Sequence, residues 1–369
     1  MRRFVVCGVL VTLLALGAGA SGFRATGVEA RSNAHSAGCG WKPVRTPAIK
    51  GGAAVLSAVV APAPNDVWLA GSQGEPMHER TLVLHYDGRS LEIVPTPNPF
   101  PKSNQLRGLA AFGPHDVWAV GEGVTRTDPV YHYVPLVLRY DGRRWIRVSG
   151  PSVNTPFGAY LDGVAGAAAD DLWSVGMARY GDDWAGLIEH WDGKQWRIVP
   201  SPTSTYHTVT AVSRSDVWAA GMANASFSPN LPVARWDGQS WELVADTAQK
   251  GWETYANASS ASGPTNVWIV GQEAAGPFVE RFDGSRFARV PIPYAHWKSN
   301  YDNEENSYLD GVAAISPRDV WAVGTFGIEH YDGRSWHLSS RDGYASIAAA
   351  SPTDIWAVGG ARVLHYRCK

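Results

Sequence analysis

The stretch Asp319-Val-Trp-Ala-Val-Gly324 decides the fold, because variants of it recur along the chain. Each copy starts with Asp or Asn, followed by an apolar residue and Trp; the seven leading residues are Asp66, Asp116, Asp171, Asp216, Asn266, Asp319 and Asp354. Successive copies are 50, 55, 45, 50, 53 and 35 residues apart. This spacing is typical of propeller blades and too long for leucine-rich or tetratricopeptide repeats. The sequence therefore predicts an all-β, seven-bladed β-propeller.

Each repeat reads as four short antiparallel strands, most clearly in the sixth, at 309–315, 319–324, 326–331 and 335–338. The first strand is rich in Ala, Gly and Val, as expected where seven innermost strands crowd around one axis. Asp-Gly turns join the third and fourth strands in six repeats. The large residues three positions after each turn Gly are expected to pack between blades: Leu91, Trp145, Trp196, Trp241, Phe287 and Trp336.

The seventh repeat ends without a fourth strand, at 364–368. Residues 40–47 match the outer strand at 195–202, so the N-terminus is expected to complete the last blade and close the ring. Cys39 and Cys368 would then lie together and form a disulfide across the closure. Acylation of Cys39 as a lipoprotein is the alternative, but the apolar N-terminal segment ends far upstream and no Leu precedes the cysteine.

Residues 1–20 have the pattern of a signal peptide, with Arg2 and Arg3 before a short apolar run and small residues at the end. Residues 21–38 are predicted to be a flexible lead, and 39–369 a single propeller domain. The apolar run is too short to span a membrane. We therefore expect a secreted or cell-surface protein, in an oxidising compartment where the disulfide persists.

Composition limits the partners. The 32 basic and 34 acidic residues nearly balance, so we expect no binding of nucleic acid. Spacings typical of zinc sites or serine hydrolases are absent, and no cofactor or metal is expected. His85, His190, His330 and His365 share one repeat position with three arginines, which indicates a structural role on separate blades. We expect a monomer.

Repeat positions that differ between blades mark a candidate site, since structural demands keep the copies alike. Nine residues before each signature Asp or Asn, at the expected start of the innermost strand, stand Ser57, Arg107, Asp162, His207, Asn257, Asp310 and Ala345. Equivalent strand starts lie on one face, so the first six are predicted to supply polar groups around the mouth of the central channel.

The longest predicted loops lie on the same face, at 72–81, 122–135, 177–186, 222–232 and 291–307. Three tryptophans outside the repeat positions, Trp184, Trp252 and Trp297, fall in or beside these segments. Exposed aromatic rings there would offer apolar platforms for a sugar ring or a protein; packing within the loops is the alternative. Function is expected on this long-loop face.

The strand that ends in Val-Gly, followed by Tyr, Trp and a Pro-containing tail, resembles kelch-type and galactose-oxidase-type repeats over residues 39–369. Most copies carry one Gly where kelch repeats carry two. The Asp-Gly-x-x-Trp turn resembles the Asp-box of sialidases, with one residue fewer between Asp and Gly. The array is also similar to those of exported bacterial proteins without known activity.

The resemblance to galactose oxidase implies a copper site that needs a free cysteine, and the mature chain has none outside the expected disulfide. The resemblance to sialidases implies an arginine cluster with an Arg-Ile-Pro signature, which is absent. The first functional hypothesis is therefore a recognition module without catalytic activity, which binds a glycan, a cell-wall fragment or a protein. The alternatives are a hydrolase or lyase with Asp162 and Asp310 as acid and base, helped by Arg107 or His207, and a structural surface protein.

Overall fold

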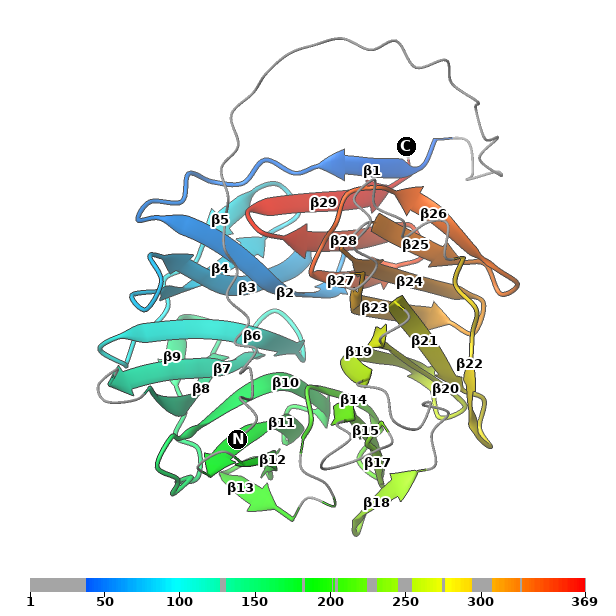
Figure 1. The fold of residues 1–369 in the computed structure, drawn as a ribbon. Helices are drawn as coiled ribbons and strands as arrows, with labels where there is room; N and C mark the ends of the chain where they lie inside the picture. The colour runs from blue at the N-terminus through cyan, green and yellow to red at the C-terminus, as the bar shows by residue number, and fades with distance from the viewer. Residues whose placement is uncertain are drawn as a thin grey trace, which may run out of the picture. The chain divides into compact units, whose positions relative to one another are not determined.

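The computed structural model describes residues 38–126, 131–180, 183–200, 202, 205–223, 231–244, 254–273, 276–293, 307–325 and 327–368. Within these ranges the chain forms 29 strands and no helix. The strands make seven antiparallel sheets arranged as the blades of a ring (Figure 1). The predicted seven-bladed propeller is confirmed.

The first four blades follow one another along the chain, and each runs from an innermost to an outermost strand. Blade one has β2 (Ala53–Ala63), β3 (Asp66–Gly74), β4 (Arg80–Tyr86) and β5 (Leu91–Ile93). Blade two has β6 (Ser103–Ala111), β7 (Val117–Arg126), β8 (His132–Tyr140) and β9 (Trp145–Arg147). Blade three has β10 (Ala159–Ala168), β11 (Asp171–Tyr180), β12 (Asp183–Trp191) and β13 (Trp196–Val199). Blade four has β14 (Thr208–Ser213), β15 (Asp216–Ala220), β17 (Val233–Trp236) and β18 (Trp241–Val244).

The last three blades complete the ring. Blade five has β19 (Thr254–Gly263), β20 (Asn266–Glu273), β21 (Gly276–Phe282) and β22 (Phe287–Arg289), and the short β16 (Met222–Ala223) adds to its inner edge. Blade six has β23 (Leu309–Ser316), β24 (Asp319–Gly324), β25 (Gly327–Tyr331) and β26 (Trp336–Ser340). Blade seven has β27 (Ser346–Ser351), β28 (Asp354–Gly359), β29 (Arg362–Arg367) and, from the N-terminus, β1 (Gly40–Pro43).

The signature Trp forms the centre of each blade, and all seven copies are at most 2% exposed. In blade one the Trp68 indole and the His85 imidazole both bond the Asp66 carboxylate, at 2.9 and 2.8 Å, and the two rings stack. His190, His330 and His365 stack on their own Trp in the same way. These histidines therefore serve the packing of four separate blades.

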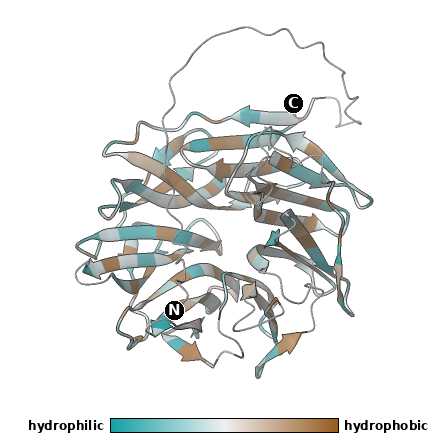
Figure 2. Ribbon diagram, in the orientation of Figure 1, coloured by the Kyte–Doolittle hydropathy of each residue, from teal (hydrophilic) through white to brown (hydrophobic). Residues whose placement is uncertain are grey.

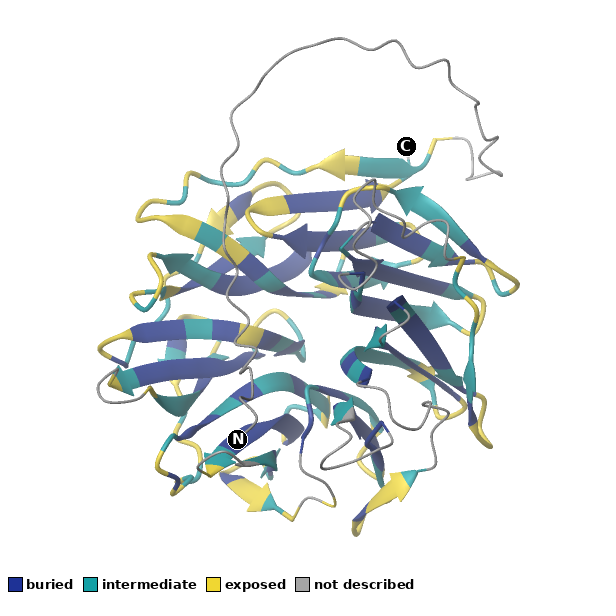
Figure 3. Cartoon of the chain, viewed as in Figure 1, coloured by how far each residue is buried: buried dark blue, intermediate teal, exposed yellow. Residues whose placement is uncertain are grey.

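Neighbouring blades interlock through aromatic rings. The outer-strand Trp145 of blade two packs edge-on against the signature Trp68 of blade one, with ring centroids 5.8 Å apart. The same contact recurs between Trp196 and Trp118 of the next pair. Apolar residues concentrate on the packed strands, while polar and exposed residues lie mainly on the outer strands and turns (Figures 2 and 3).

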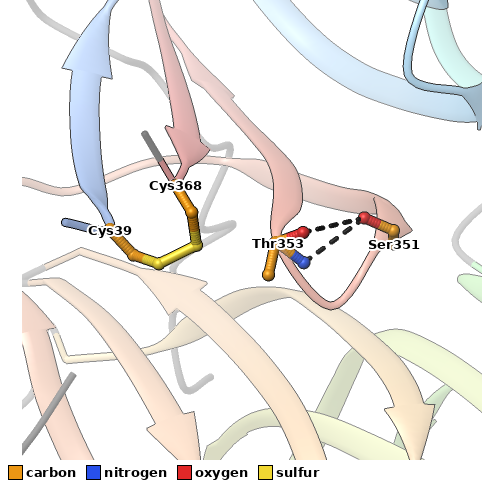
Figure 4. The surroundings of a disulfide bond; sticks show 4 residues. All are labelled: Cys39, Ser351, Thr353 and Cys368. Atoms are coloured by element: carbon orange, nitrogen blue, oxygen red, sulfur yellow. Dashed lines mark hydrogen bonds between the residues drawn. A yellow bond between two sulfur atoms is a disulfide. The ribbon is translucent and has the colours of Figure 1, made fainter. Parts of the chain in front are cut away.

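The ring closes as the sequence predicts. β1 pairs with β29, with Trp41 opposite Tyr366, and Trp41 packs edge-on against Trp321 at 5.7 Å, the contact that the other outer-strand aromatics make. Cys39 and Cys368 form a disulfide at the end of this strand pair (Figure 4). It lies beside the turn in which the Thr353 amide donates to Ser351 Oγ. The disulfide thus joins the two ends of the ring.

The Asp-Gly turns have the expected backbone. All six glycines have positive φ, between 87° and 101°, which only glycine adopts without strain. In blade one the Asp87 carboxylate accepts from the amides of Arg89 and Ser90 at 2.9 and 3.0 Å. These hydrogen bonds lower the pKa of Asp87. The turn therefore uses Asp to hold the backbone and Gly to reverse it.

Candidate functional site at the channel mouth

Five of the seven predicted mouth positions lie at β-bulges of the innermost strands, and the other two lie at the predicted strand starts. The pairing of innermost and second strands skips one residue in five blades, and the skipped residues are Ser57, Arg107, Asp162, Asn257 and Asp310. His207 and Ala345 directly precede β14 and β27. A bulge re-aims the extra side chain, so this irregularity gives these five residues an orientation different from that of their strand neighbours.

The Gly that ends the signature stretch is the partner of this bulge. A Cβ atom on Gly121 would lie 2.0 Å from the carbonyl oxygen of Gln105, and one on Gly176 would lie 2.0 Å from that of Tyr160. Six of the signature glycines face a carbonyl at 1.8 to 2.0 Å in this way. The Gly is therefore required because the bulged strand approaches its neighbour too closely for any side chain.

Two segments predicted to be loops on this face are instead long β-hairpins. β7 and β8 pair as far as Arg126 and His132, and β11 and β12 pair as far as Tyr180 and Asp183. The predicted loops at 122–135 and 177–186 are wrong in this respect, because their aromatic and β-branched residues continue the ladder. Trp184 consequently lies on β12, and Trp252 and Trp297 lie outside the described residues.

Four side chains from blades two, three and four form a line of charge, which we call the charge chain. The Arg107 guanidinium bonds Glu122 at 3.1 Å and Asp162 at 3.0 Å. His207 Nδ1 donates to the other oxygen of Asp162 at 3.0 Å. Glu122 and Asp162 are only 6% and 11% exposed, whereas Arg107 is 39% exposed. The buried carboxylates thus hold a cationic group at the surface of the mouth.

The environment keeps Asp162 ionised. Burial alone would favour its neutral form, but the hydrogen bond from His207 and the charge of Arg107 outweigh burial and lower the pKa of Asp162. Burial and the charge of Asp162 raise the pKa of the neighbouring Tyr160, which remains a neutral phenol. The charge chain therefore combines fixed charges with a neutral aromatic hydroxyl.

An aromatic shelf adjoins the charge chain on and beside β8, β10 and β12 and consists of Tyr131, Tyr133, Phe157, Tyr160 and Trp184. Ring centroids are 6.3 Å apart from Tyr131 to Tyr133, 6.1 Å from Tyr133 to Tyr160, and 5.9 Å from Tyr160 to Trp184. Arg107 lies over the Tyr160 ring, which connects the shelf to the charge chain. Arg179 lies over both Phe157 and Trp184.

The mouth positions in other blades have a different role. Ser57 Oγ donates to the carbonyl of Leu106 at 2.7 Å, and the Asn257 amide donates to that of Leu309 at 2.9 Å. Each acceptor directly precedes the bulge residue of the next blade. Ser57 and Asn257 are therefore donors that bind adjacent blades, and the prediction that they bind a ligand gains no support from these contacts.

Four residues of the site were not found from the sequence: Glu122, Phe157, Tyr160 and Arg179. Of these residues, only Glu122 has a sequence feature that could have marked it: it is the one charged residue that directly follows a signature Gly. Tyr160 lies against Tyr133 of blade two, and Arg179 lies over Phe157 and Trp184; no repeat comparison reveals these contacts.

The other end of the channel has fewer groups that could bind or react with a ligand. It opens as a cavity of about 650 Å³ lined by parts of four innermost strands, among them Val60, Ser260, Val312 and Ile347. None of its lining residues carries a charge. In the described ranges no three His, Cys, Asp or Glu side chains gather as a metal site, and no helix long and apolar enough to cross a membrane occurs among them.

Comparison with known proteins supports the fold and gives no family. No family model and no curated protein matches the chain. Solved structures match at low identity, each over about nine-tenths of this chain. YCF48 bound to D1 peptide is 14% identical over 89% of this chain and 97% of its own, with a TM-score of 0.59. The RRP9 WD40 repeats are 13% identical over 89% and 98%, with a TM-score of 0.62. Streptogramin B lyase is 12% identical over 90% and 98%, with a TM-score of 0.60.

These likenesses show the propeller fold alone, since proteins with such different names share it. Kelch-type or galactose-oxidase-type membership therefore stays a prediction. The contacts of Asp162 argue against a role as a free general base. Both of its carboxylate oxygens already accept hydrogen bonds, one from Arg107 and one from His207 in the neighbouring blades.

Proposed function

We propose that the protein is an exported recognition module without catalytic activity, and that it binds a segment of another protein at the channel mouth on the long-loop face. The aromatic shelf beside the charge chain carries this proposal. Interfaces are enriched in Tyr, Trp and Arg, which combine a large apolar area with hydrogen-bonding groups. Here these residue types lie together on and beside β8, β10, β11 and β12 of two adjacent blades.

The contacts at the rest of the mouth support a binding site at blades two to four. There the bulge residues Arg107 and Asp162 are charged, Arg107 lies over the Tyr160 ring of the shelf, and Tyr131 of the shelf is 45% exposed. In blades one and five the bulge residues bind the neighbouring blade instead. YCF48, which has a similar fold, carries a bound peptide; this agrees with the proposal by analogy of fold only. Export rests on the predicted signal peptide and is consistent with the disulfide.

The test is capture of partners by immobilised mature protein, residues 21–369, from an extract of the native cell envelope, in parallel with an array of glycans and cell-wall polysaccharides. Tyr131→Ala removes an exposed ring of the shelf. Ile198→Ala is the matched control, because Ile198 is equally exposed at 46% but lies on the outer strand β13.

We expect a protein that is retained by the wild type and by Ile198→Ala and lost with Tyr131→Ala. Retention by all three forms would place binding elsewhere and overturn the proposal. Selective retention on the glycan array, lost with Tyr131→Ala, would assign the same surface to a carbohydrate.

A further inference from the structure

The bulge residue of blade six differs from all the others. Ser57 and Asn257 donate to a carbonyl of the next blade, and Arg107, Asp162 and His207 bond one another. Asp310 occupies the same bulge position, yet it makes no hydrogen bond or ion pair with any residue that the structure describes. It is the one polar bulge side chain with no partner in the neighbouring blade.

The repeat explains this isolation. By correspondence with Leu106 and Leu309, we expect blade seven to present to Asp310 the carbonyl of Tyr344, which directly precedes Ala345. A carbonyl satisfies the donors Ser57 and Asn257, but an ionised carboxylate can only accept. Ala345 in turn offers no polar side chain. An acidic residue at this position is thus mismatched to the structural role of the repeat.

No opposite charge compensates for the mismatch. Burial raises the pKa of Asp310 to about 7, and no neighbouring charge contributes to that change. On one side of Asp310, the neighbouring strand β19 has the neutral Asn257 at the equivalent position. Blade seven carries Tyr344, and Arg362 there lies over the Tyr344 ring, donates to the Gly343 carbonyl and pairs with Asp342 at 4.0 Å. A partly buried carboxylate without a counter-charge is complemented by a cation.

We propose that Asp310 is the specificity-determining residue of the mouth and binds a cationic group, a lysine or arginine side chain or an N-terminal ammonium, on the partner's segment. This inference rests on the proposed function. The aromatic shelf would hold the apolar part of the segment, and the cation would enter the mouth and pair with Asp310. Binding then requires the ionised carboxylate, so affinity should rise by about tenfold from pH 6 to pH 8.

Asp310→Asn is the decisive substitution. It removes the negative charge and supplies a side-chain amide, which can donate to the Tyr344 carbonyl as Asn257 does to Leu309. We expect the variant to melt at a higher temperature than the wild type while losing the cation. Asp170→Asn is the matched control, because it makes the same change of charge at an exposed turn before a signature strand.

The experiment selects a random linear peptide library against mature protein at pH 8, followed by titration of the selected peptides. We expect one position to be restricted to lysine or arginine or to the free amine. Replacing it by norleucine or citrulline, or acetylating the amine, should weaken binding by roughly tenfold or more. Asp310→Asn should abolish this difference and the dependence on pH, and Asp170→Asn should retain both.

The outcomes separate the two proposals. Selected peptides that bind through the shelf but show no cationic position, or whose cationic position is equally important in Asp310→Asn, would overturn this inference and leave the proposed function standing. Failure to select any peptide would overturn both.

Discussion

Glu189 should destabilise the protein at neutral pH, and its replacement by Leu should remove that effect. The side chain lies on β12, is 0% exposed and packs near Gly150. Both carboxylate oxygens are buried without a hydrogen-bond partner among the described residues. Blades one, two and seven have Leu84, Leu138 and Leu364 in the corresponding place. A leucine therefore fits this site in the repeat.

The magnitude follows from the pKa. Burial raises the pKa of Glu189 from 4.5 to about 8. Each pKa unit is equivalent to about 1.4 kcal/mol, so full ionisation costs about 5 kcal/mol and the cost at pH 7 is about 3 kcal/mol. The folded state binds the proton more tightly than the unfolded state, so stability is highest below pH 4.5. It falls as pH rises to 8 and is constant above that.

Urea denaturation of wild type and Glu189→Leu at pH 5, 7 and 8 measures the effect. We expect the variant to be more stable by about 3 kcal/mol at pH 7, with a smaller gain at pH 5. Glu189→Gln is the control that removes the charge and keeps a polar group, and it should lose the same dependence on pH. A variant less stable than wild type at pH 8, or a gain that is equal at pH 5 and pH 8, would refute the reasoning.

Three further substitutions test the closure of the ring and the mouth. Cys39→Ser should lower the free energy of unfolding by about 2 to 5 kcal/mol, and wild type should lose as much in reductant; two free thiols in the unreduced wild type, seen by mass spectrometry, would exclude the disulfide. Trp41→Ala removes the contact with Trp321 and should cost about 3 kcal/mol in urea denaturation; an unchanged midpoint would mean that β1 is dispensable. Gly121→Ala places a methyl group 2.0 Å from the Gln105 carbonyl and should cost about 3 kcal/mol, and a neutral effect would show that the bulge at Arg107 is not rigid.

The sequence by itself determined the propeller, the number of blades and their closure. These properties depend on local patterns that recur along the chain: a Trp in each second strand, an Asp-Gly turn before the fourth strand of six blades, and Trp41 with Cys39 where the seventh copy lacks its last strand. Such patterns can be recognised in the sequence because every blade packs against its neighbours in the same way and needs the same residue types at the same repeat positions.

Only the tertiary structure decided what each mouth residue does. Asn257 and Asp310 occupy the same repeat position and are nearly the same size, yet one donates to the next blade and the other has no partner among the described residues. The difference arises because the Asn amide can donate to a carbonyl of the next blade, whereas an ionised Asp can only accept, and the group it would need belongs to a different blade. The aromatic shelf likewise spans two blades, because Tyr133 on β8 lies against Tyr160 on β10, a contact between blades that no pattern within one blade contains.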